Sequence, residues 1–261
     1  MESIVCRVCG RLSDRVFTLP VLGRDTSYHD CRHCGYLQTE SPTWLDAAYA
    51  QAINDCDTGI MSRNWQNVGR VIMTLAAYRR LDGSVIDHAG GYGILVRSLR
   101  DAGIEARWRD KYCENLLARG FEAGEEPCDL LTAFEVLEHM IDPVTELQHM
   151  LQQAPVILLS TELIPGAATP SSDWWYLGPE HGQHIGFFRL STLRAIAAKL
   201  QCRFASDGER IHIFSRSPVP RSWALLQRLG RFWPLVARLK LEPKIMSDFY
   251  RMSKNPKARA D

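Results

Sequence analysis

The chain has 261 residues, of which 46% are apolar, enough to bury the core of one large domain or of one domain with small additions. No apolar run approaches the roughly 18 residues of a membrane-spanning helix, so no transmembrane helix is expected. The formal net charge is +1, but residues 216–261 carry 11 basic and 3 acidic side chains (net +8), whereas residues 1–215 carry 20 and 27 (net −7).

The amino-terminal stretch MESIVCRVCG lacks the basic and apolar regions of a secretion signal. We therefore expect a cytoplasmic protein. A reducing compartment argues against a disulfide framework for the eight cysteines, so a different explanation of their spacing is needed.

Two CxxC pairs stand near the amino terminus. Cys6 and Cys9 form the first pair, Cys31 and Cys34 form the second, and a glycine follows each pair. Two such knuckles direct four thiolates at one point, which is the shell of a tetrahedral zinc ion. Because four thiolates leave no open position, we predict a structural zinc in a zinc-ribbon-like module over residues 1–40; the alternative is four unrelated buried cysteines. The other cysteines lack this spacing and are predicted to be core or surface residues: Cys56, Cys113, Cys128 and Cys202.

Residues 41–83 carry mainly helical patterns, which we interpret as a helical lid or linker. A core domain is expected over residues 84–217. It begins with a short strand over 84–87, a turn in the sequence AGGYG, and an amphipathic helix that Gly103 ends. A second strand ends at Asp110, about 20 residues after the glycine turn, which is the spacing that puts a carboxylate near a ribose.

Together with a later segment, this unit resembles the class I S-adenosylmethionine (SAM)-dependent methyltransferases. Their first motif is an acidic residue followed by a GxGxG turn, here Asp87 to Gly93, and many carry an EVLEH-like segment after the fourth strand, here residues 135–139. The resemblance covers roughly residues 60–217 and implies a Rossmann-like α/β sheet with flanking helices. It implies that Asp110 holds the ribose, that Asp87 orders the turn or the methionine amine, and that further cofactor contacts come from this set: Ala89, Gly90, Gly91, Gly93, Phe134 and Glu135. Ala89 departs from the family's glycine.

The stretch between the second strand and the fourth is short. Asp110 and Asp129 are 19 positions apart, so we expect the third strand to be very short, over GFEAG at 120–124, or missing. Cys128 and Asp129 are candidates for the adenine contact.

Glu135, Glu138 and His139 are spaced to share one face of a helical turn. Three roles are open. They shape the floor of a cleft, or His139 is a general base that Glu138 orients, or the three bind a divalent ion, as a similar run does in quinone-precursor O-methyltransferases. Asp142 and Pro143 then predict the cap and first position of the next helix.

A loop rich in aromatic residues and histidine follows the fifth strand. Two tryptophans, Tyr176, His181 and His184 lie within residues 173–184, which suits a substrate pocket; the alternative is a loop that covers the core. With the four-cysteine module and the class I core, this loop resembles those of bacterial sugar-type methyltransferases. That resemblance implies a histidine or tyrosine base acting on a nucleotide-linked keto-sugar, with His181 and His184 favoured and Tyr176 behind them.

Residues 218–261 predict a basic, amphipathic helical tail that Pro234 interrupts. The tail is expected to pack on its own domain or on a second copy in a homodimer; binding to a membrane surface is the alternative.

We expect SAM-dependent methyl transfer to a small-molecule acceptor: a sugar, a nucleotide-sugar, or a polysaccharide-linked hydroxyl or carbon. One alternative is an RNA methyltransferase, but the core is acidic and no basic and aromatic face suggests a nucleic-acid partner. A second alternative is a non-catalytic, zinc-stabilised interaction protein with a degenerate methyltransferase fold.

Overall fold

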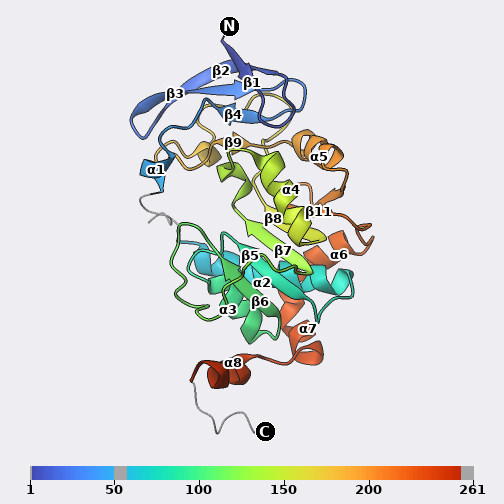
Figure 1. Cartoon of the computed structure of the whole chain (residues 1–261). Helices are drawn as coiled ribbons and strands as arrows, with labels where there is room; N and C mark the ends of the chain where they lie inside the picture. The colour runs from blue at the N-terminus through green and yellow to red at the C-terminus, as the bar shows by residue number, and fades with distance from the viewer. Residues whose placement is uncertain (1, 50–57, 254–261) are drawn as a thin grey trace. The chain divides into compact units, whose positions relative to one another are not determined.

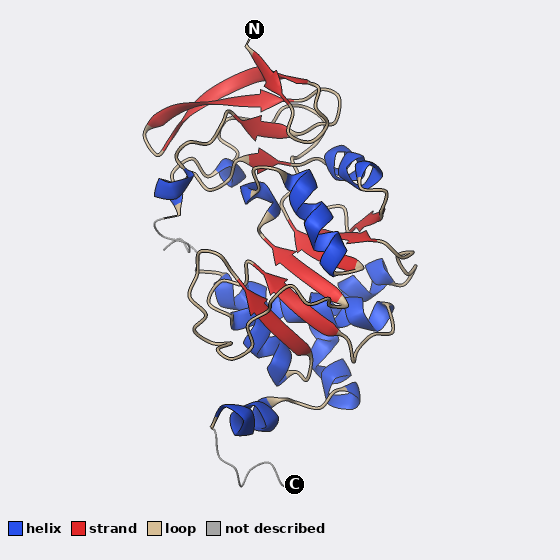
Figure 2. Cartoon of the chain, in the orientation of Figure 1, coloured by secondary structure: helices blue, strands red, loops and turns tan. Residues whose placement is uncertain are grey.

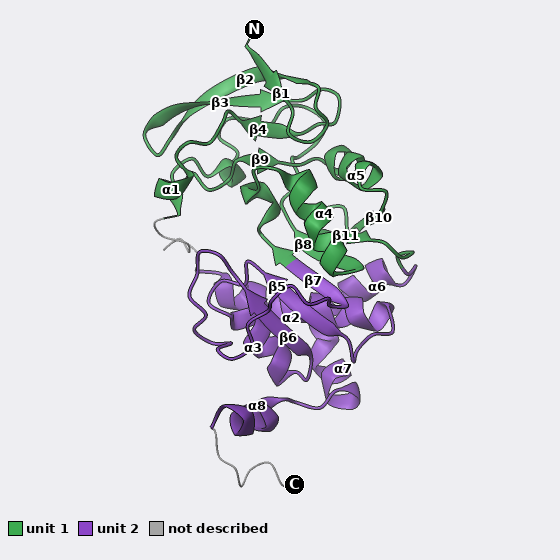
Figure 3. Ribbon diagram, in the orientation of Figure 1, with its two compact units in different colours: residues 1–54, 133–219 green, residues 55–132, 220–261 purple. Residues whose placement is uncertain are grey.

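The computed structural model describes residues 2–49 and 58–253, and Figure 1 traces the chain from its amino to its carboxyl terminus. Cys56 and part of the expected helical linker lie outside the described residues. The chain forms two compact units, residues 1–54 with 133–219 and residues 55–132 with 220–261. Figure 3 colours these units, here called unit 1 and unit 2. Both are discontinuous in sequence, because each takes up two separate stretches of the chain.

One sheet has the Rossmann-like topology expected from the sequence (Figure 2). Its strands, in the order β10-β11-β8-β7-β5-β6, are β10 (Arg203–Ser206), β11 (Ile211–Ser215), β8 (Val156–Ser160), β7 (Leu130–Phe134), β5 (Ser84–His88) and β6 (Glu105–Arg109). β5 pairs in parallel with both β6 and β7, and β11 pairs antiparallel with β8 and β10. The sheet is therefore mixed, with its antiparallel pairs at one end.

The expected third strand is reduced to a single parallel bridge. Trp108 of β6 bridges Glu122, its amide donates to the carbonyl of Phe121 over 2.8 Å, and its carbonyl accepts from the amide of Ala123 over 2.7 Å. These partners lie within GFEAG, as predicted.

Two helices begin or end at residues that the sequence marks as helix boundaries. In unit 2, α3 (Ile94–Asp101) follows the glycine turn and ends before Gly103, whose φ is 102°. In unit 1, Asp142 caps α4 (Pro143–Gln153) by accepting from the amide of Thr145 over 3.0 Å. The remaining helices of the core are α2 (Ile60–Ala77) and α5 (Leu190–Lys199).

A second sheet in unit 1 contains the cysteine pairs. Its strands, in the order β1-β2-β3-β4-β9, are β1 (Ser3–Val5), β2 (Leu12–Val21), β3 (Arg24–Asp30), β4 (Leu37–Thr39) and β9 (Gly186–Phe187). The amino-terminal module thus forms a continuous sheet with a strand nearly 150 residues later in the chain. A short helix, α1 (Leu45–Ala48), follows β4.

The module and the aromatic loop also share a hydrophobic core. Tyr28 and Leu37 of the module pack with Tyr176, Leu177 and Phe187, all of them nearly or fully buried. The indole of Trp44 adds a hydrogen bond to the carbonyl of Gly182 over 2.8 Å. The module therefore contacts the loop that carries the candidate base residues, which the sequence did not indicate.

The tail packs against its own unit. It contains α6 (Trp223–Arg228), α7 (Trp233–Lys240) and α8 (Ile245–Met252). Trp223 is fully buried and donates to the hydroxyl of Thr74 of α2 over 3.1 Å, and Asp248 forms ion pairs with Arg97 and Arg100 of α3. Pro234 occupies the first turn of α7, so it starts a helix instead of interrupting one.

Within the described residues, none of the helices combines the length and apolar character that a membrane span requires.

Candidate functional site

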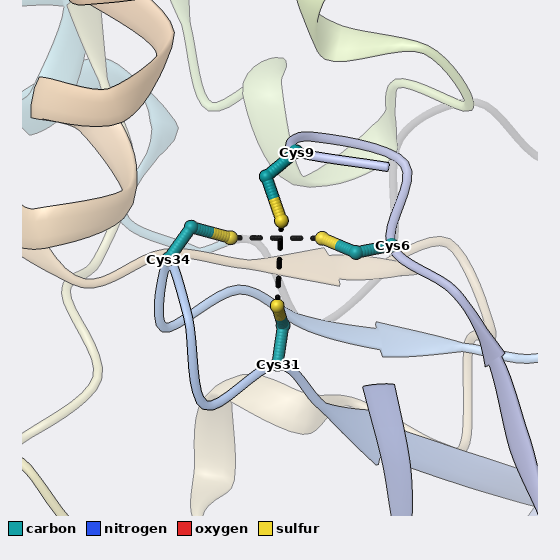
Figure 4. A group of neighbouring side chains, drawn as sticks. All are labelled: Cys6, Cys9, Cys31 and Cys34. Atoms are coloured by element: carbon teal, nitrogen blue, oxygen red, sulfur yellow. Dashed lines mark hydrogen bonds between the residues drawn. The ribbon is translucent and has the colours of Figure 1, made fainter. Parts of the chain in front are cut away.

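The four cysteines of the two CxxC pairs meet at one point, where Figure 4 shows their sulfur atoms converging. The Sγ atoms of Cys6 and Cys34 are 3.6 Å apart, and those of Cys9 and Cys31 are 3.5 Å apart. Four sulfurs at zinc–sulfur bonds of ~2.3 Å in a tetrahedron are separated by about 3.8 Å, so the donor set fits a zinc ion. The knuckle glycines, Gly10 and Gly35, have φ of 76° and 77°.

The glycine turn in unit 2 requires its glycines for two different reasons. Gly91 and Gly93 have φ of 54° and 84°, in the left-handed region that favours glycine. Gly90 has an ordinary φ, but a Cβ there would lie 2.8 Å from the Trp108 ring and 2.9 Å from Oδ2 of Asp87. Ala89 has φ of 57°, so the alanine occupies a backbone conformation for which glycine is better suited.

Asp110 holds the turn in place. Its Oδ2 accepts from the amide of Gly91 over 2.9 Å, and its Oδ1 accepts from the amides of Tyr112 and Cys113 over 2.7 and 2.8 Å. Two carboxylate oxygens offer about four acceptor positions, so three amides leave one position for a hydroxyl group.

Asp87 is a buried carboxylate at the carboxyl-terminal end of β5. Thr132 donates to its Oδ1 over 2.6 Å. Burial, reinforced by the charge of Asp110, raises the pKa of Asp87 to about 7, although the Thr132 hydrogen bond opposes the shift. A carboxylate that costs this much to ionise is suited to a cationic partner, and SAM carries an ammonium and a sulfonium group. The residues of the turn therefore fit this cofactor.

The candidates for the adenine contact, Cys128 and Asp129, are wrong. Both precede β7, and Oδ2 of Asp129 accepts from the amide and hydroxyl of Ser84, at the start of β5, over 2.9 and 3.2 Å. They lie at the amino-terminal ends of the strands, whereas ligands of such sheets bind at the carboxyl-terminal ends.

In unit 1, Glu135 follows β7 with φ of 54°, a strained conformation for a residue other than glycine. Its amide donates to the hydroxyl of Ser160, which itself donates to Oε1 of Glu135 over 2.6 Å. The hydroxyl of Tyr176 lies 3.3 Å from Oε2. Phe134 ends β7 and is half-buried.

Glu138 and His139 lie in a 3-10 turn, η1 (Leu137–His139), and Tyr176 lies in another, η2 (Trp175–Leu177). The hydroxyl of Tyr176 donates to Oε1 of Glu138 over 2.7 Å. Glu138 is fully buried, and its burial, with the nearby charge of Glu135, raises its pKa to about 8. Burial and the two carboxylates also raise the pKa of Tyr176.

Three histidines, His139, His181 and His184, lie next to one another close to Glu138 and Tyr176. The rings of His139 and His184 are 4.9 Å apart edge to face, and those of His181 and His184 are 4.8 Å apart. Burial lowers the pKa of each, that of His184 to about 4, so all three are neutral at pH 7.

Hydrogen bonds assign the tautomers of His184 and His181. Nδ1 of His184 lies 2.6 Å from the carbonyl of Tyr176, which can only accept, so Nδ1 carries the proton and Nε2 has a free lone pair. Nδ1 of His181 instead accepts from the amide of Gln183 over 3.1 Å, which places the proton on Nε2.

A profile of the methyltransferase domain family matches residues 60–206, more than half of the chain. The chain belongs to this family. It is a SAM-dependent methyltransferase with the class I fold. No curated protein matches the sequence.

The methyltransferase is also similar in fold to solved structures. One is a magnesium protoporphyrin IX methyltransferase from Synechocystis PCC 6803 with bound S-adenosylhomocysteine, at 19% identity and a TM-score of 0.47, covering 67% of this chain and 96% of that chain. Another is an O-methyltransferase family protein from Burkholderia thailandensis, at 15% identity and a TM-score of 0.48, covering 68% and 64% of the two chains.

Each unit of the methyltransferase collects one set of the predicted residues. Unit 2 brings Asp87, the glycine turn and Asp110 together, and unit 1 brings together Glu138, His139, Tyr176 and the two loop histidines. Sequence reasoning missed three residues that hold these groups: Thr132, Ser160 and Tyr49, whose hydroxyl lies 2.9 Å from Nδ1 of His139. No motif marks these residues, because each becomes relevant only through a contact across the fold.

Proposed function

We propose that the enzyme transfers the methyl group of SAM to a sugar, a nucleotide-sugar, or a polysaccharide-linked hydroxyl or carbon. The observation that carries this proposal is the cluster in unit 1, where the imidazole of His184 and the carboxyl group of Glu138 lie against the buried side chain of Tyr176. Such a set of donors and acceptors suits an acceptor rich in hydroxyl groups. Trp175, two-thirds exposed in the same loop, offers an apolar face for a ring.

For the cofactor, the residues of unit 2 would act as the family resemblance implies. The turn from Ala89 to Gly93 would contact SAM. Asp87 would meet the methionine ammonium, and the remaining acceptor position of Asp110 would take a ribose hydroxyl. Bound SAM supplies an activated methyl group, so the protein has to orient the acceptor and manage one proton.

The base candidates differ in whether their lone pairs already accept a hydrogen bond. Nε2 of His184 has no hydrogen-bond partner within residues 2–49 and 58–253, whereas Nδ1 of His181 accepts a backbone amide and its Nε2 packs against Gly178. Tyr176 donates its proton to Glu138 and has a raised pKa. His184 is therefore favoured over His181 and Tyr176, and His139 remains a further candidate.

We also propose a structural metal, a division of the chain into regions, and partners. The cysteine module would hold a structural zinc, and the four consecutive segments, 1–40, 41–83, 84–217 and 218–261, would be distinct regions of sequence. The partner would be a small-molecule acceptor in the cytoplasm. A membrane surface or a second copy would meet the exposed side of the tail.

The test combines calorimetry with an acceptor screen. Titration of the zinc-loaded enzyme with SAM should show binding, and incubation with nucleotide-sugars should give a product heavier by one methylene unit. Absence of SAM binding by folded protein would exclude the cofactor assignment. Methylation of RNA, with no sugar methylated, would overturn the acceptor assignment.

A further inference from the structure

The cluster in unit 1 contains three groups arranged like metal ligands. Glu138, His139 and His184 each offer one ligand atom, and these atoms lie within 4.8 Å of one another. Nε2 of His139 is 3.9 Å from Oε1 of Glu138. Small side-chain movements would bring three such atoms to bonding distance of one ion, because metal–nitrogen and metal–oxygen bonds measure ~2.0–2.2 Å.

Each of the three groups makes a hydrogen bond through one of its polar atoms. The Tyr176 carbonyl fixes Nδ1 of His184, the Tyr49 hydroxyl meets Nδ1 of His139, and the Tyr176 hydroxyl donates to Oε1 of Glu138. A ligating histidine usually donates its second ring N–H to a carbonyl, carboxylate or water in this way, and ligating carboxylates are hydrogen-bonded as well. His184 follows this pattern, with its free lone pair on Nε2.

A second observation points to a bound cation. Oε2 of Glu138 is buried and has no hydrogen-bond partner among the described residues, although Glu138 is fully inaccessible to solvent. A buried carboxylate oxygen without a partner is costly, and a cation removes that cost.

We propose that Glu138, His139 and His184 bind a divalent first-row transition ion. Two imidazoles and one carboxylate favour zinc, iron, cobalt, nickel or manganese over magnesium, which prefers oxygen ligands. Glu135, which the sequence placed in a divalent site, is held by Ser160 and lies outside the group. The site differs in kind from the cysteine site, because three protein ligands leave coordination positions open.

This inference rests on the proposed function for its role in the reaction. An open position would take an acceptor hydroxyl oxygen, and the ion would lower the pKa of that hydroxyl, whose proton would pass to water. The lone pairs of His139 and His184 would then serve the ion, and the ion would replace an imidazole base.

The test counts ions in the full-length enzyme after loading with cobalt. The cysteine site gives a thiolate-to-cobalt charge-transfer band, and the proposed site adds one further ion per chain without such a band. Glu138→Gln and His184→Ala should each lose this further ion and keep the charge-transfer band, which also shows that unit 1 is folded. The matched control is His149→Ala, an exposed histidine of α4, which should bind as many ions as the wild type.

If the wild type binds cobalt at the cysteine site alone, or if Glu138→Gln keeps the further ion, the metal inference is wrong. Methylation of a sugar by an enzyme without the further ion would refute the role of the ion in the reaction and leave the proposed function standing. If the enzyme binds the further ion but methylates no sugar, the metal site is supported and the proposed acceptor is wrong.

Discussion

Ala89 shows how one methyl group matters in a turn made for glycine. Its φ of 57° lies in the left-handed region, which costs a residue with a Cβ roughly 1–2 kcal/mol. The side chain is exposed, so the cost comes from the backbone and not from crowding.

We expect Ala89→Val to destabilise the enzyme by at least ~1 kcal/mol, because a β-branched side chain is a poorer fit to positive φ than alanine. Ala89→Gly should stay within about 1 kcal/mol of the wild type, since relief of strain is offset by greater freedom of the unfolded chain. Urea unfolding measures both. Equal stability of the valine and glycine variants would contradict the strain seen at this position.

Asp87 titrates in the physiological range, with a pKa raised to about 7 by burial and by Asp110. The folded pKa lies above the unfolded value, so ionisation opposes folding, and stability without cofactor falls as pH rises from about 4 to about 7. A cationic ligand binds more tightly to the ionised form of Asp87, so the affinity for SAM rises with pH whereas the stability without cofactor falls.

SAM should therefore bind more tightly as pH rises toward 7, by up to about tenfold per pH unit. Asp87→Asn should bind SAM weakly and with little dependence on pH over this range, because the amide does not titrate and can still accept from Thr132. Calorimetric titrations at several pH values measure the slope. The same slope in the variant would exclude Asp87 as the group responsible.

Among the elements, β9 links the cysteine module to the histidine loop. Directly after it, Arg189 makes a two-pronged, buried ion pair with Asp30 at the end of β3, over 3.0 and 2.9 Å. The guanidinium also donates to the carbonyl of Gly35 in the second knuckle over 2.6 Å.

Arg189→Met should destabilise unit 1 by about 3 kcal/mol, because it leaves the Asp30 carboxylate buried without its partner. Arg194→Met, at an exposed position of α5, is the control and should have little effect. Thermal unfolding and the affinity for zinc are the measurements. Equal losses in the two variants would show that the Asp30 pair does not stabilise the module.

The antiparallel end of the mixed sheet contains a buried histidine. His212 of β11 has Nδ1 2.8 Å from the hydroxyl of Ser206 and Nε2 3.2 Å from the carbonyl of Thr161. The carbonyl requires the proton on Nε2, and burial lowers the pKa of His212 to about 4.

Because this folded pKa is below the unfolded value of 6.5, the stabilisation is complete above pH 6.5 and is lost as pH falls toward 4. The loss amounts to about 3 kcal/mol at 1.36 kcal/mol per pKa unit. Unfolding curves between pH 7 and pH 4 should show a steeper decline for the wild type than for His212→Asn. Parallel declines would mean that other groups cause the acid sensitivity.

At the scale of the whole molecule, the basic tail completes unit 2. Asp248 of α8 accepts from Arg97 and from two nitrogens of Arg100, and Arg100 also bonds Glu105 over 2.7 Å. The ring of Phe121 lies 3.8 Å from the guanidinium of Arg100. One acidic residue in a basic segment therefore anchors the tail.

Asp248→Asn should destabilise the enzyme by about 3 kcal/mol, because the buried Arg100 loses one of its two charged partners and Arg97 loses its pair with Asp248. Glu242→Gln, at an exposed position of the tail, should change the stability by less than ~0.5 kcal/mol. Hydrogen exchange along α3 and α8 should locate the loss in unit 2. Unchanged exchange in α3 would contradict an anchoring role for Asp248.

Local signals in the sequence were sufficient for the turns, caps and helices. The spacing of Cys6, Cys9, Cys31 and Cys34, the glycine turn and the Asp142 cap depend on neighbouring residues, and the structure places all of them as predicted. The reduced third strand also followed from chain length alone, since 19 positions leave little room for another strand and its connections.

Only the tertiary structure decided what these local units contact. Two examples are the pairing of β4 with β9 and the hydrogen bond between Asp129 and Ser84, which join residues far apart in the chain. A third is the tautomer of His184, which the carbonyl of Tyr176 determines. Such contacts depend on strand register and on which buried polar atoms remain to be satisfied. Sequence periodicity reveals neither the strand register nor the unsatisfied polar atoms. The residue types of the site were therefore predictable from the sequence, whereas their hydrogen-bond partners and proton positions required the assembled fold.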